Sequence, residues 1–341
     1  MRGNRWVVLA LSLGLAAAAC SSNKTTGTQG GGGGGGKQLT SVSFRLDWIV
    51  DGSHTCFFDA LTQGYFRQQG LDVQILEGAG SGTTATLVAN GSNDFGFSDA
   101  GVVAKTINSG AKIKMVADIF ERSPSIIISS KSSNINGPKD LAGKSVGGTS
   151  GEAPLQLLPA YLTANGVDPN QVKVVNIDPA AKIPALLKGR VDAIVAYSSS
   201  DLPVAEGEAP GQLAVQHYAD FGVITLSNGL ITTDDMIKSK PEVVRGFVKA
   251  VQMGFDDCQK DPAAAIGRLV DRFPQTVNKD QATIALQEVV GNLHTDRTKD
   301  KPVGYMDPQD WADTLKTLQQ YAGFTNPQAP ETYFTNDFVG S

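Results

Sequence analysis

Residues 45–73 read RLDWIVDGSHTCFFDALTQGYFRQQGLDV, and this stretch decides the fold. At its start, residues 42–46 alternate apolar and polar side chains, which predicts a strand. Asp47 and Trp48 follow at the carboxyl end of that strand, and after a loop we expect a helix whose first turn carries His54. Strand-end side chains and free N–H groups of a helix N-terminus therefore meet in one small volume, which is how an open α/β sheet forms a ligand site.

Strands and helices alternate from Thr40 onward, which is typical of an α/β protein with mostly parallel sheets. The predicted strands are residues 72–76, 94–97, 112–119, 125–130, 145–147, 172–177 and 191–197, and the predicted helices include 83–90, 100–109 and 152–165. Residues 223–232 are expected to form an extended connection. From Pro241 the chain is predicted to be mostly helical.

Length and charge limit the classes of function. A chain of 341 residues suggests two lobes or domains. Its formal net charge is −5, so no basic surface indicates nucleic-acid binding. The three histidines, His54, His217 and His294, are far apart in sequence, and a metal site built from histidine and cysteine is hard to assemble. We therefore expect no metal.

The N-terminal segment is expected to be a targeting signal. Residues 1–19 hold two arginines, an apolar run at 7–15 and four consecutive alanines at 16–19, and they resemble a lipoprotein signal ending before Cys20. Cys20 would then carry the lipid that anchors the protein outside the cytoplasm; the alternative is an ordinary cleaved signal with an incidental cysteine. Residues 20–39, with seven consecutive glycines, are predicted to be a flexible linker.

The sequence does not decide whether two further cysteines, Cys56 and Cys258, form a disulfide. An extracytoplasmic location permits the bond, but a single pair carries no spacing signal. We favour two free, partly buried thiols.

Several motifs resemble those of ABC-transporter solute-binding proteins in the group that binds sulfonates, nitrate and pyrimidine precursors of thiamine. Their order and spacing over residues 41–275 carry the resemblance. The matching stretches are Leu46-Asp-Trp with His54, Gly64-Tyr-Phe followed by Gly70-Leu-Asp-Val, the segment 87–96, Pro138-Lys-Asp-Leu-Ala-Gly-Lys, Gly189-Arg-Val-Asp-Ala and the segment 240–247.

The resemblance implies a bilobed, type II periplasmic-binding-protein fold with two mixed or mostly parallel sheets flanked by helices. The hinge would be crossed near residues 126–130 and 223–232. Lobe 1 would comprise residues 40–127 and 228–341, and lobe 2 residues 128–227. A small molecule would bind in the cleft and be enclosed by hinge closure.

Candidate ligand-binding residues of lobe 1 follow predicted strands. Trp48 is expected to stack on a flat ligand, with a core tryptophan as the alternative. Asp47 lies beside it, and His54 is expected either to bind ligand or to cap its own helix. Ser98 and Asp99 open a helix, so ligand contact competes with N-capping there.

Lobe 2 offers the opposing face. The sequence GGTSGE at residues 147–152 follows a strand and begins a helix, so its N–H groups are predicted to form a nest for an anion or a carbonyl oxygen. Glu152 is expected to accept hydrogen bonds from a ligand amino group, or only to lie favourably at a helix N-terminus. Asp220 is either a ligand contact or a turn residue. The candidates in this lobe are Thr149, Ser150, Gly151, Glu152, Tyr197 and Asp220.

The charges of these candidates favour a neutral or cationic nitrogen heterocycle, such as a pyrimidine precursor of thiamine. Asp47, Asp99, Glu152 and Asp220 are acidic, and Arg122 is the one nearby cation expected. A sulfonate such as taurine, or nitrate, would need cationic donors or several N–H groups, and these anions are the alternative ligands.

The function expected is a monomeric receptor that passes its ligand to a membrane permease and its ATPase. Common catalytic motifs are missing from the sequence, so we expect neither catalysis nor a cofactor. A cytoplasmic pyrimidine synthase with pyridoxal phosphate and iron is a less favoured alternative, because this chain has a signal segment and no cysteine-rich iron motif. A ligand sensor is a further alternative.

Overall fold

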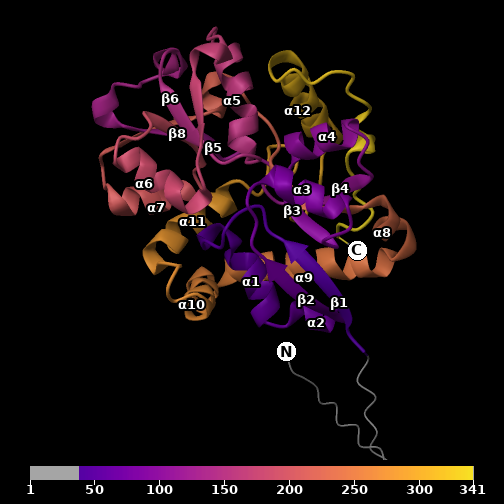
Figure 1. The fold of residues 1–341 in the computed structure, drawn as a ribbon. Helices are drawn as coiled ribbons and strands as arrows, with labels where there is room; N and C mark the ends of the chain where they lie inside the picture. Colours follow the sequence, from indigo (N-terminus) through magenta and orange to yellow (C-terminus); the bar gives the residue numbers. More distant parts are fainter. Residues whose placement is uncertain (1–37, 341) are drawn as a thin grey trace, which may run out of the picture. The chain divides into compact units, whose positions relative to one another are not determined.

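Two five-stranded sheets organise the computed structural model, which describes residues 38–340 (Figure 1). The first sheet has the order β2-β1-β3-β10-β4, and the second has the order β7-β6-β8-β5-β9. The strands are β1 (Thr40–Arg45), β2 (Leu71–Leu76), β3 (Phe95–Asp99), β4 (Ile113–Asp118), β5 (Ser125–Ser130), β6 (Ser145–Gly148), β7 (Lys173–Asn176), β8 (Ala193–Tyr197), β9 (Leu213–His217) and β10 (Asn228–Thr233). The predicted signal and Cys20 lie outside the described residues.

Both sheets are mixed, as predicted. Strand β1 pairs in parallel with β2 and β3, and β6 pairs in parallel with β7 and β8. The exceptions are the strands that arrive from the other sheet: β5 is antiparallel to β8 and β9, and β10 is antiparallel to β3 and β4. The chain therefore runs through the first sheet, crosses into the second and returns.

The first crossing lies earlier than the sequence suggested. The chain leaves the first sheet at Asp118 and enters the second at Ser125, so residues 126–130 form β5 inside the second sheet. The second crossing spans residues 218–227, between β9 and β10, so it too lies earlier than expected, and residues 228–232 form β10 inside the first sheet. A buried apolar strand and an extended connection have the same sequence pattern, which explains the shift. The lobe boundaries themselves stay predictions.

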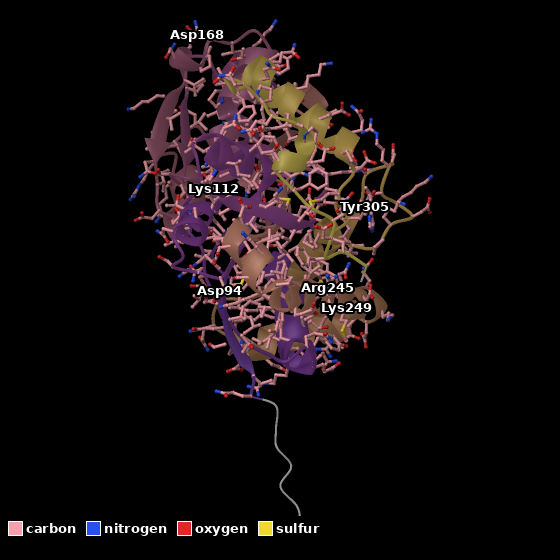
Figure 2. All side chains as sticks on the ribbon, turned by 90° about the vertical axis from the view of Figure 1, so that its right-hand side faces the viewer. Asp94, Lys112, Asp168, Arg245, Lys249 and Tyr305 are labelled. Carbon is pink, nitrogen blue, oxygen red and sulfur yellow. A yellow bond between two sulfur atoms is a disulfide. The ribbon has the colours of Figure 1, made fainter. Side chains whose placement is uncertain are left out.

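Helices cover both sheets. They are α1 (Thr55–Thr62), α2 (Tyr65–Gln68), α3 (Ser81–Ala89), α4 (Ala100–Asn108), α5 (Ala153–Ala164), α6 (Lys182–Leu187), α7 (Asp201–Glu208), α8 (Asp234–Ser239), α9 (Pro241–Lys260), α10 (Pro262–Arg272), α11 (Lys279–Gly291) and α12 (Pro308–Tyr321). Within residues 38–340, none of these helices has the length and apolar character needed to span a membrane. Exposed side chains carry charges of both signs, among them Lys112, Asp168 and Lys249 (Figure 2).

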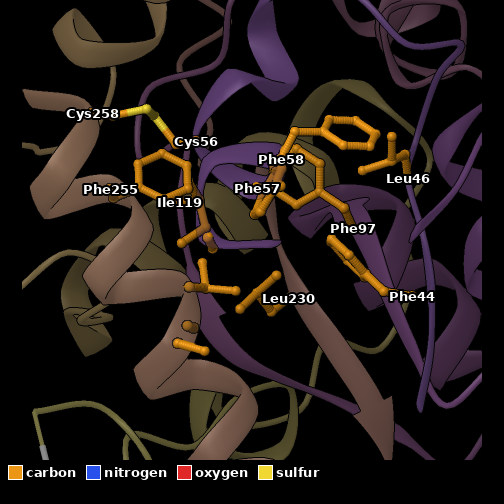
Figure 3. Close-up of a cluster of buried hydrophobic side chains, with 14 of the residues drawn as sticks. Phe44, Leu46, Cys56, Phe57, Phe58, Phe97, Ile119, Leu230, Phe255 and Cys258 are labelled. Atoms are coloured by element: carbon orange, nitrogen blue, oxygen red, sulfur yellow. A yellow bond between two sulfur atoms is a disulfide. The ribbon is translucent and has the colours of Figure 1, made fainter. Parts of the chain in front are cut away.

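Interlocked phenylalanines fix β1 against α1 and α9 (Figure 3). The ring of Phe57 lies edge-on to those of Phe44, Phe97 and Phe255, with centroids 5.2, 4.9 and 5.3 Å apart. Phe57 and Phe58 are both buried in this core. Because aromatic pairs prefer this edge-to-face geometry, the cluster sets where β1 ends and therefore where Asp47 and Trp48 lie.

A second core joins the two sheets. Met115 and Ile231 of the first sheet share it with Ile127 and Val195 of the second, and Trp311 of α12 is fully buried in it. The C-terminal helix α12 packs against α5. Residues near the end of the chain therefore support both sheets.

A disulfide joins Cys56 of α1 to Cys258 of α9, so the expectation of free thiols is wrong. The two Cα atoms are 5.6 Å apart, although 202 positions separate the residues in sequence. Only the packing of α1 on α9 brings the two residues together. Both cysteines are buried in the phenylalanine core.

Removing this disulfide should destabilise the protein. Replacing both Cys56 and Cys258 with alanine is expected to lower the free energy of unfolding by about 2–4 kcal/mol, because the bond restricts a long loop in the unfolded chain. Urea unfolding of the wild type and the double variant measures the difference. A reductant should destabilise the wild type and leave the double variant unchanged; equal stability of the two oxidised proteins would contradict the prediction.

Candidate functional site

Polar side chains from three strands meet at one edge of the first sheet. Asp47 follows β1, Asp99 ends β3, and Asn228 begins β10. Asn228 pairs with Asp99 because β10 runs antiparallel to β3, so the start of β10 lies beside the end of β3. This edge is where the sequence placed the ligand site of lobe 1.

Asp47 is the centre of a hydrogen-bond network that reaches the second sheet. Its Oδ1 accepts from His54 Nε2 at 3.1 Å, and its Oδ2 accepts from Asn228 Nδ2 at 2.7 Å. The hydroxyl of Tyr197, at the end of β8, donates to Asn228 Oδ1 at 3.0 Å. Tyr197 also lies 3.2 Å from the Ser227 hydroxyl, so it bridges the two sheets at the second crossing.

His54 holds the Asp47 carboxylate in place through a hydrogen bond. It ends a short 3₁₀ turn (Gly52–His54), and its Nδ1 accepts the backbone N–H of Asp51 at 3.3 Å, which closes a capping box. Its Nε2–H then donates to Asp47. Burial lowers the pKa of His54, but the carboxylates of Asp51 and Asp47 raise it, and the net direction is upward. Of the two roles expected for His54, the structure shows capping, and the element capped is this 3₁₀ turn rather than α1. Ligand contact by His54 stays a prediction.

Asp99 and Ser98 are both used by the fold. Asp99 Oδ1 caps α4 by accepting the N–H groups of Gly101 and Val102 at 2.8 and 3.1 Å, and its Oδ2 accepts from the Ser227 hydroxyl. Burial raises the pKa of Asp99 to about 6. The Ser98 hydroxyl donates to the Ser81 carbonyl at 3.1 Å. Ligand contact by either residue stays a prediction.

The loop before α5 has fewer free donors than the sequence suggested. The N–H of Thr149 donates to Glu152 Oε1 at 2.5 Å, and the N–H of Ser150 donates to Asn176 Oδ1 at 2.8 Å. The Gly151 carbonyl accepts the N–H of Gly82, from α3, at 2.9 Å. Two N–H groups of the expected anion nest are therefore already bonded within the protein.

Lys182, which the sequence reading missed, provides the buried cation of the site. Its ammonium, at the start of α6, lies 2.7 Å from Glu152 Oε2 and 2.9 Å from Asp201 Oδ2. The same ammonium lies 4.5 Å from the centroid of the Trp48 ring. Lys182 has no exposed surface. Because most lysines are exposed to solvent, a lysine at the start of a helix is expected to be a surface charge, and no signal in the sequence marks Lys182 as buried.

The charges of this cluster are coupled. Burial lowers the pKa of Lys182, whereas Asp201 and Glu152 raise it by more, so the lysine stays protonated. Burial raises the pKa of Glu152 to about 7, although Lys182 opposes the shift. With two carboxyl groups and one ammonium, the cluster has one more acidic group than basic groups.

The space beside this cluster is small. A cavity of about 20 Å³ is bounded by Asp47, Trp48, Ser81, Glu152, Tyr197 and Asp201. This volume holds about one water molecule. Gly80 lies so close to the opposite loop that a Cβ there would be 2.7 Å from the Gly151 carbonyl carbon. The two faces are therefore in contact, and an aromatic ligand enters only if they separate.

Asp220 and Arg122, which were expected near the ligand, lie away from this cavity. Asp220 is exposed on a 3₁₀ turn (Ala219–Phe221) and does not border the cavity. Arg122 pairs with Asp296 at 3.1 Å and borders another cavity, of about 610 Å³, at the crossings. The expectation that Arg122 is the nearby cation is therefore wrong, because Lys182 holds that position. Among residues 38–340, no cluster of three or more histidine, cysteine, aspartate or glutamate side chains could hold a metal ion.

Comparison with known proteins gives one family and consistent relatives. The model of the family described as "NMT1/THI5 like" matches residues 51–265. The formylaminopyrimidine-binding protein of Halalkalibacterium halodurans is 23% identical over 87% of this chain and 90% of its own length. The riboflavin-binding protein RibY of Chloroflexus aurantiacus is 24% identical over 88% and 86%. Other relatives are named as 4-amino-5-hydroxymethyl-2-methylpyrimidine phosphate synthases.

Solved structures support the fold. The alkanesulfonate-binding protein SsuA from Xanthomonas axonopodis pv. citri, bound to MOPS, has a TM-score of 0.69 and covers 87% of this chain and 99% of its own. Its sequence identity is 13%, so the likeness concerns the fold. The bilobed periplasmic-binding-protein fold predicted from the sequence is confirmed.

Asp99→Asn should change how stability depends on pH. A carboxyl group whose pKa is raised by folding contributes its stability below the unfolded value of 3.8 and loses it as the pH rises through about 6. At about 1.4 kcal/mol per pKa unit, the loss is on the order of 3 kcal/mol. Asparagine caps helices as well as aspartate does and has no charge to bury. We expect the variant to gain stability relative to the wild type between pH 4 and pH 7.

Urea unfolding at the two pH values measures this change. Asp168→Asn, at an exposed cap of a 3₁₀ turn (Pro169–Gln171), is the matched control and should follow the wild type. Parallel pH profiles of Asp99→Asn and the wild type would contradict the assignment.

Proposed function

Because the chain belongs to the NMT1/THI5 like family, we propose that it is an extracytoplasmic solute-binding lipoprotein of an ABC importer. Its ligand would be a small, flat nitrogen heterocycle, such as a pyrimidine precursor of thiamine. Two relatives that align over most of this chain are named for binding formylaminopyrimidine and riboflavin, both of which contain such rings. These names support the ligand class.

The observation that carries the proposal is that the indole ring of Trp48 and several carboxylates line one cavity. Trp48, Asp47, Glu152 and Asp201 border the same cavity, and they come from both sheets. An aromatic face attracts flat rings and cations, and carboxylates accept hydrogen bonds from amino groups. A flat ring with N–H donors satisfies both kinds of surface.

The same charges disfavour an anionic ligand. The Lys182 ammonium is already held by Glu152 and Asp201, and the N–H groups of Thr149 and Ser150 are bonded within the protein. A sulfonate or nitrate would therefore meet carboxylates without free donors. Sulfonate or nitrate binding is the alternative that the sequence motifs left open.

Capture would proceed by closure of two lobes about the crossings at residues 119–124 and 218–227. Lobe 1 would comprise residues 40–127 and 228–341 and lobe 2 residues 128–227, as the sequence predicts, except that the earlier first crossing moves residues 125–127 into lobe 2. The bond between the Gly82 N–H and the Gly151 carbonyl would form on closure and break on opening.

An enzymatic function is the less favoured alternative. Relatives named as pyrimidine phosphate synthases motivate it. Within residues 38–340, the buried side chains of His54 and Asp47 form their other hydrogen bonds with Asp51 and Asn228, and neither of these supplies a hydroxyl or a thiol. Cys56 is bonded to Cys258. Chemical conversion of a bound pyrimidine by the purified protein would favour the synthase, and ligand-dependent uptake would favour transport over sensing.

The partners in this proposal are a membrane permease and its ATPase, and the receptor would act as a monomer tethered through Cys20.

Cys20→Ser should abolish the anchor, because serine offers no thiol for lipid attachment. We expect the wild type in the membrane fraction with a radiolabelled fatty acid, and the variant without label. Absence of label from the wild type would favour the ordinary cleaved signal, and label on the variant would place the lipid on another residue; either result contradicts attachment at Cys20.

Trp48→Ala should weaken ligand binding by about 1–3 kcal/mol, the value typical of base–aromatic stacking. Calorimetric titration with 4-amino-2-methylpyrimidine measures the loss, and Trp48→Phe, which keeps an aromatic face, should retain most of the affinity. If both variants fold and bind as the wild type does, Trp48 is a core residue only. If the wild type binds taurine or nitrate tightly and gives no heat with aminopyrimidines, the heterocycle proposal fails.

A further inference from the structure

The cavity at the crossings is much larger than the one beside Trp48. It measures about 610 Å³, a volume typical of small-molecule sites. It is bordered by residues 121–123 of the first crossing, by residues 223–226 of the second, and by residues 295–297 with the start of α12. A molecule bound there would touch both segments that join the two sheets.

One oxygen of a buried carboxyl group in this wall has no partner. Glu121 is 2% exposed, and its Oε2 accepts the N–H of Thr295 at 3.1 Å and the hydroxyl of Thr298. Its Oε1 accepts no hydrogen bond from any of residues 38–340. His294 Nδ1 lies 3.8 Å from Oε1, which is too far for a hydrogen bond. Because buried polar atoms in native proteins are nearly always bonded, Glu121 Oε1 is in need of a donor.

The second crossing brings another unpartnered atom to the same cavity. Thr225 is 4% exposed, and within the described part of the chain its hydroxyl has no hydrogen-bond partner. The N–H of Ser123 donates to the Thr225 carbonyl at 3.1 Å, so the two crossings lie side by side. Val223 and Ile224 add apolar surface to the wall, and Ile224 is 68% exposed. Few polar atoms beside an apolar wall are the usual lining of a small-molecule site.

Both guanidinium groups at this cavity already have acidic partners. Arg122 lies 3.1 Å from Asp296, and Arg297 pairs with Asp310 and, at 3.1 Å, with Asp313. An anionic ligand would therefore have to displace a carboxylate from one of these pairs. The wall disfavours anions for this reason.

The Glu121 carboxyl, in contrast, lacks a compensating positive charge. Burial raises the pKa of Glu121 to about 7 and lowers the pKa of His294, so that the nearby ring is neutral. An ammonium group that donates to Oε1 would supply both a hydrogen bond and the opposite charge. A metal ion fits less well, because residues 38–340 contain no cluster of three or more histidine, cysteine, aspartate or glutamate side chains that could hold one.

We propose that the cavity at the crossings is a second ligand site, which binds a small organic amine. The ammonium group donates to Glu121 Oε1 and to the Thr225 hydroxyl, and the apolar body packs on Val223 and Ile224. No residue that borders this cavity borders the one beside Trp48. The second site therefore goes beyond the function proposed above and does not depend on it.

Glu121→Gln tests the site with cyclohexylamine as the probe. In calorimetric titration at pH 8, where the Glu121 carboxyl is ionised and the amine is protonated, the wild type should bind. The variant should bind at least tenfold more weakly, because its amide has no charge. Its side-chain oxygen can still accept from Thr295 and Thr298, with the NH₂ group in the place of Oε1, so the fold should persist. A wild type that gives no heat at millimolar amine, or a variant with full affinity, overturns the site.

Two controls separate a specific site from attraction to an acidic surface. Asp296→Asn removes a carboxylate of the same charge from the exposed rim of the same cavity and should change the affinity less than threefold. Cyclohexanecarboxylate, a ring of the same size with the opposite charge, should not bind the wild type. Equal losses in Asp296→Asn and Glu121→Gln, or binding of the carboxylate, would overturn the inference.

Thr225→Val protects the experiment against a Glu121→Gln variant that fails to fold. Valine has nearly the shape of threonine and removes a hydroxyl that has no partner within residues 38–340, so this variant should be stable. It should bind cyclohexylamine at least threefold more weakly than the wild type. Unchanged affinity in the folded Thr225→Val variant contradicts the contact with the second crossing and overturns the site. Thermal unfolding without the amine shows which variants are folded.

Discussion

A buried ammonium is stable only among compensating acceptors, and the site depends on this constraint. Lys182 lies between Glu152 and Asp201 with no exposed surface. These residues belong to the starts of α6, α5 and α7, so one ion cluster fixes three helix starts beside the second sheet. Its contact with Trp48 extends the constraint to the first sheet.

The crossing strands determine what faces the cluster. Because β10 is antiparallel to β3, Asn228 begins its strand where Asp99 ends another, and Asn228 donates a hydrogen bond to Asp47. Tyr197 reaches Asn228 from the second sheet. The polar residues thus form one continuous set of hydrogen bonds across the second crossing, and separating the faces breaks it there.

Prediction from sequence succeeded where the deciding contacts are local. The strand before Asp47, the helix that Asp99 caps and the loop before Glu152 each follow from neighbouring residues. Trp48 and Tyr197 both border the small cavity, and their contact with a ligand stays a prediction. The expected free N–H groups and the cation at Arg122 failed, because distant residues decide both: Asn176 takes one N–H group, and Arg122 turns to Asp296.

The sequence by itself determined the order of strands and helices from Thr40 to Tyr197 and the candidate residues at strand ends, although it marked neither α7 nor β9. These depend on periodicity and on capping within a few positions along the chain. The tertiary structure decided that Cys56 pairs with Cys258 and that Lys182 is the cation on Trp48. Both contacts join residues more than a hundred positions apart, and only the packing of whole helices on sheets brings such residues together.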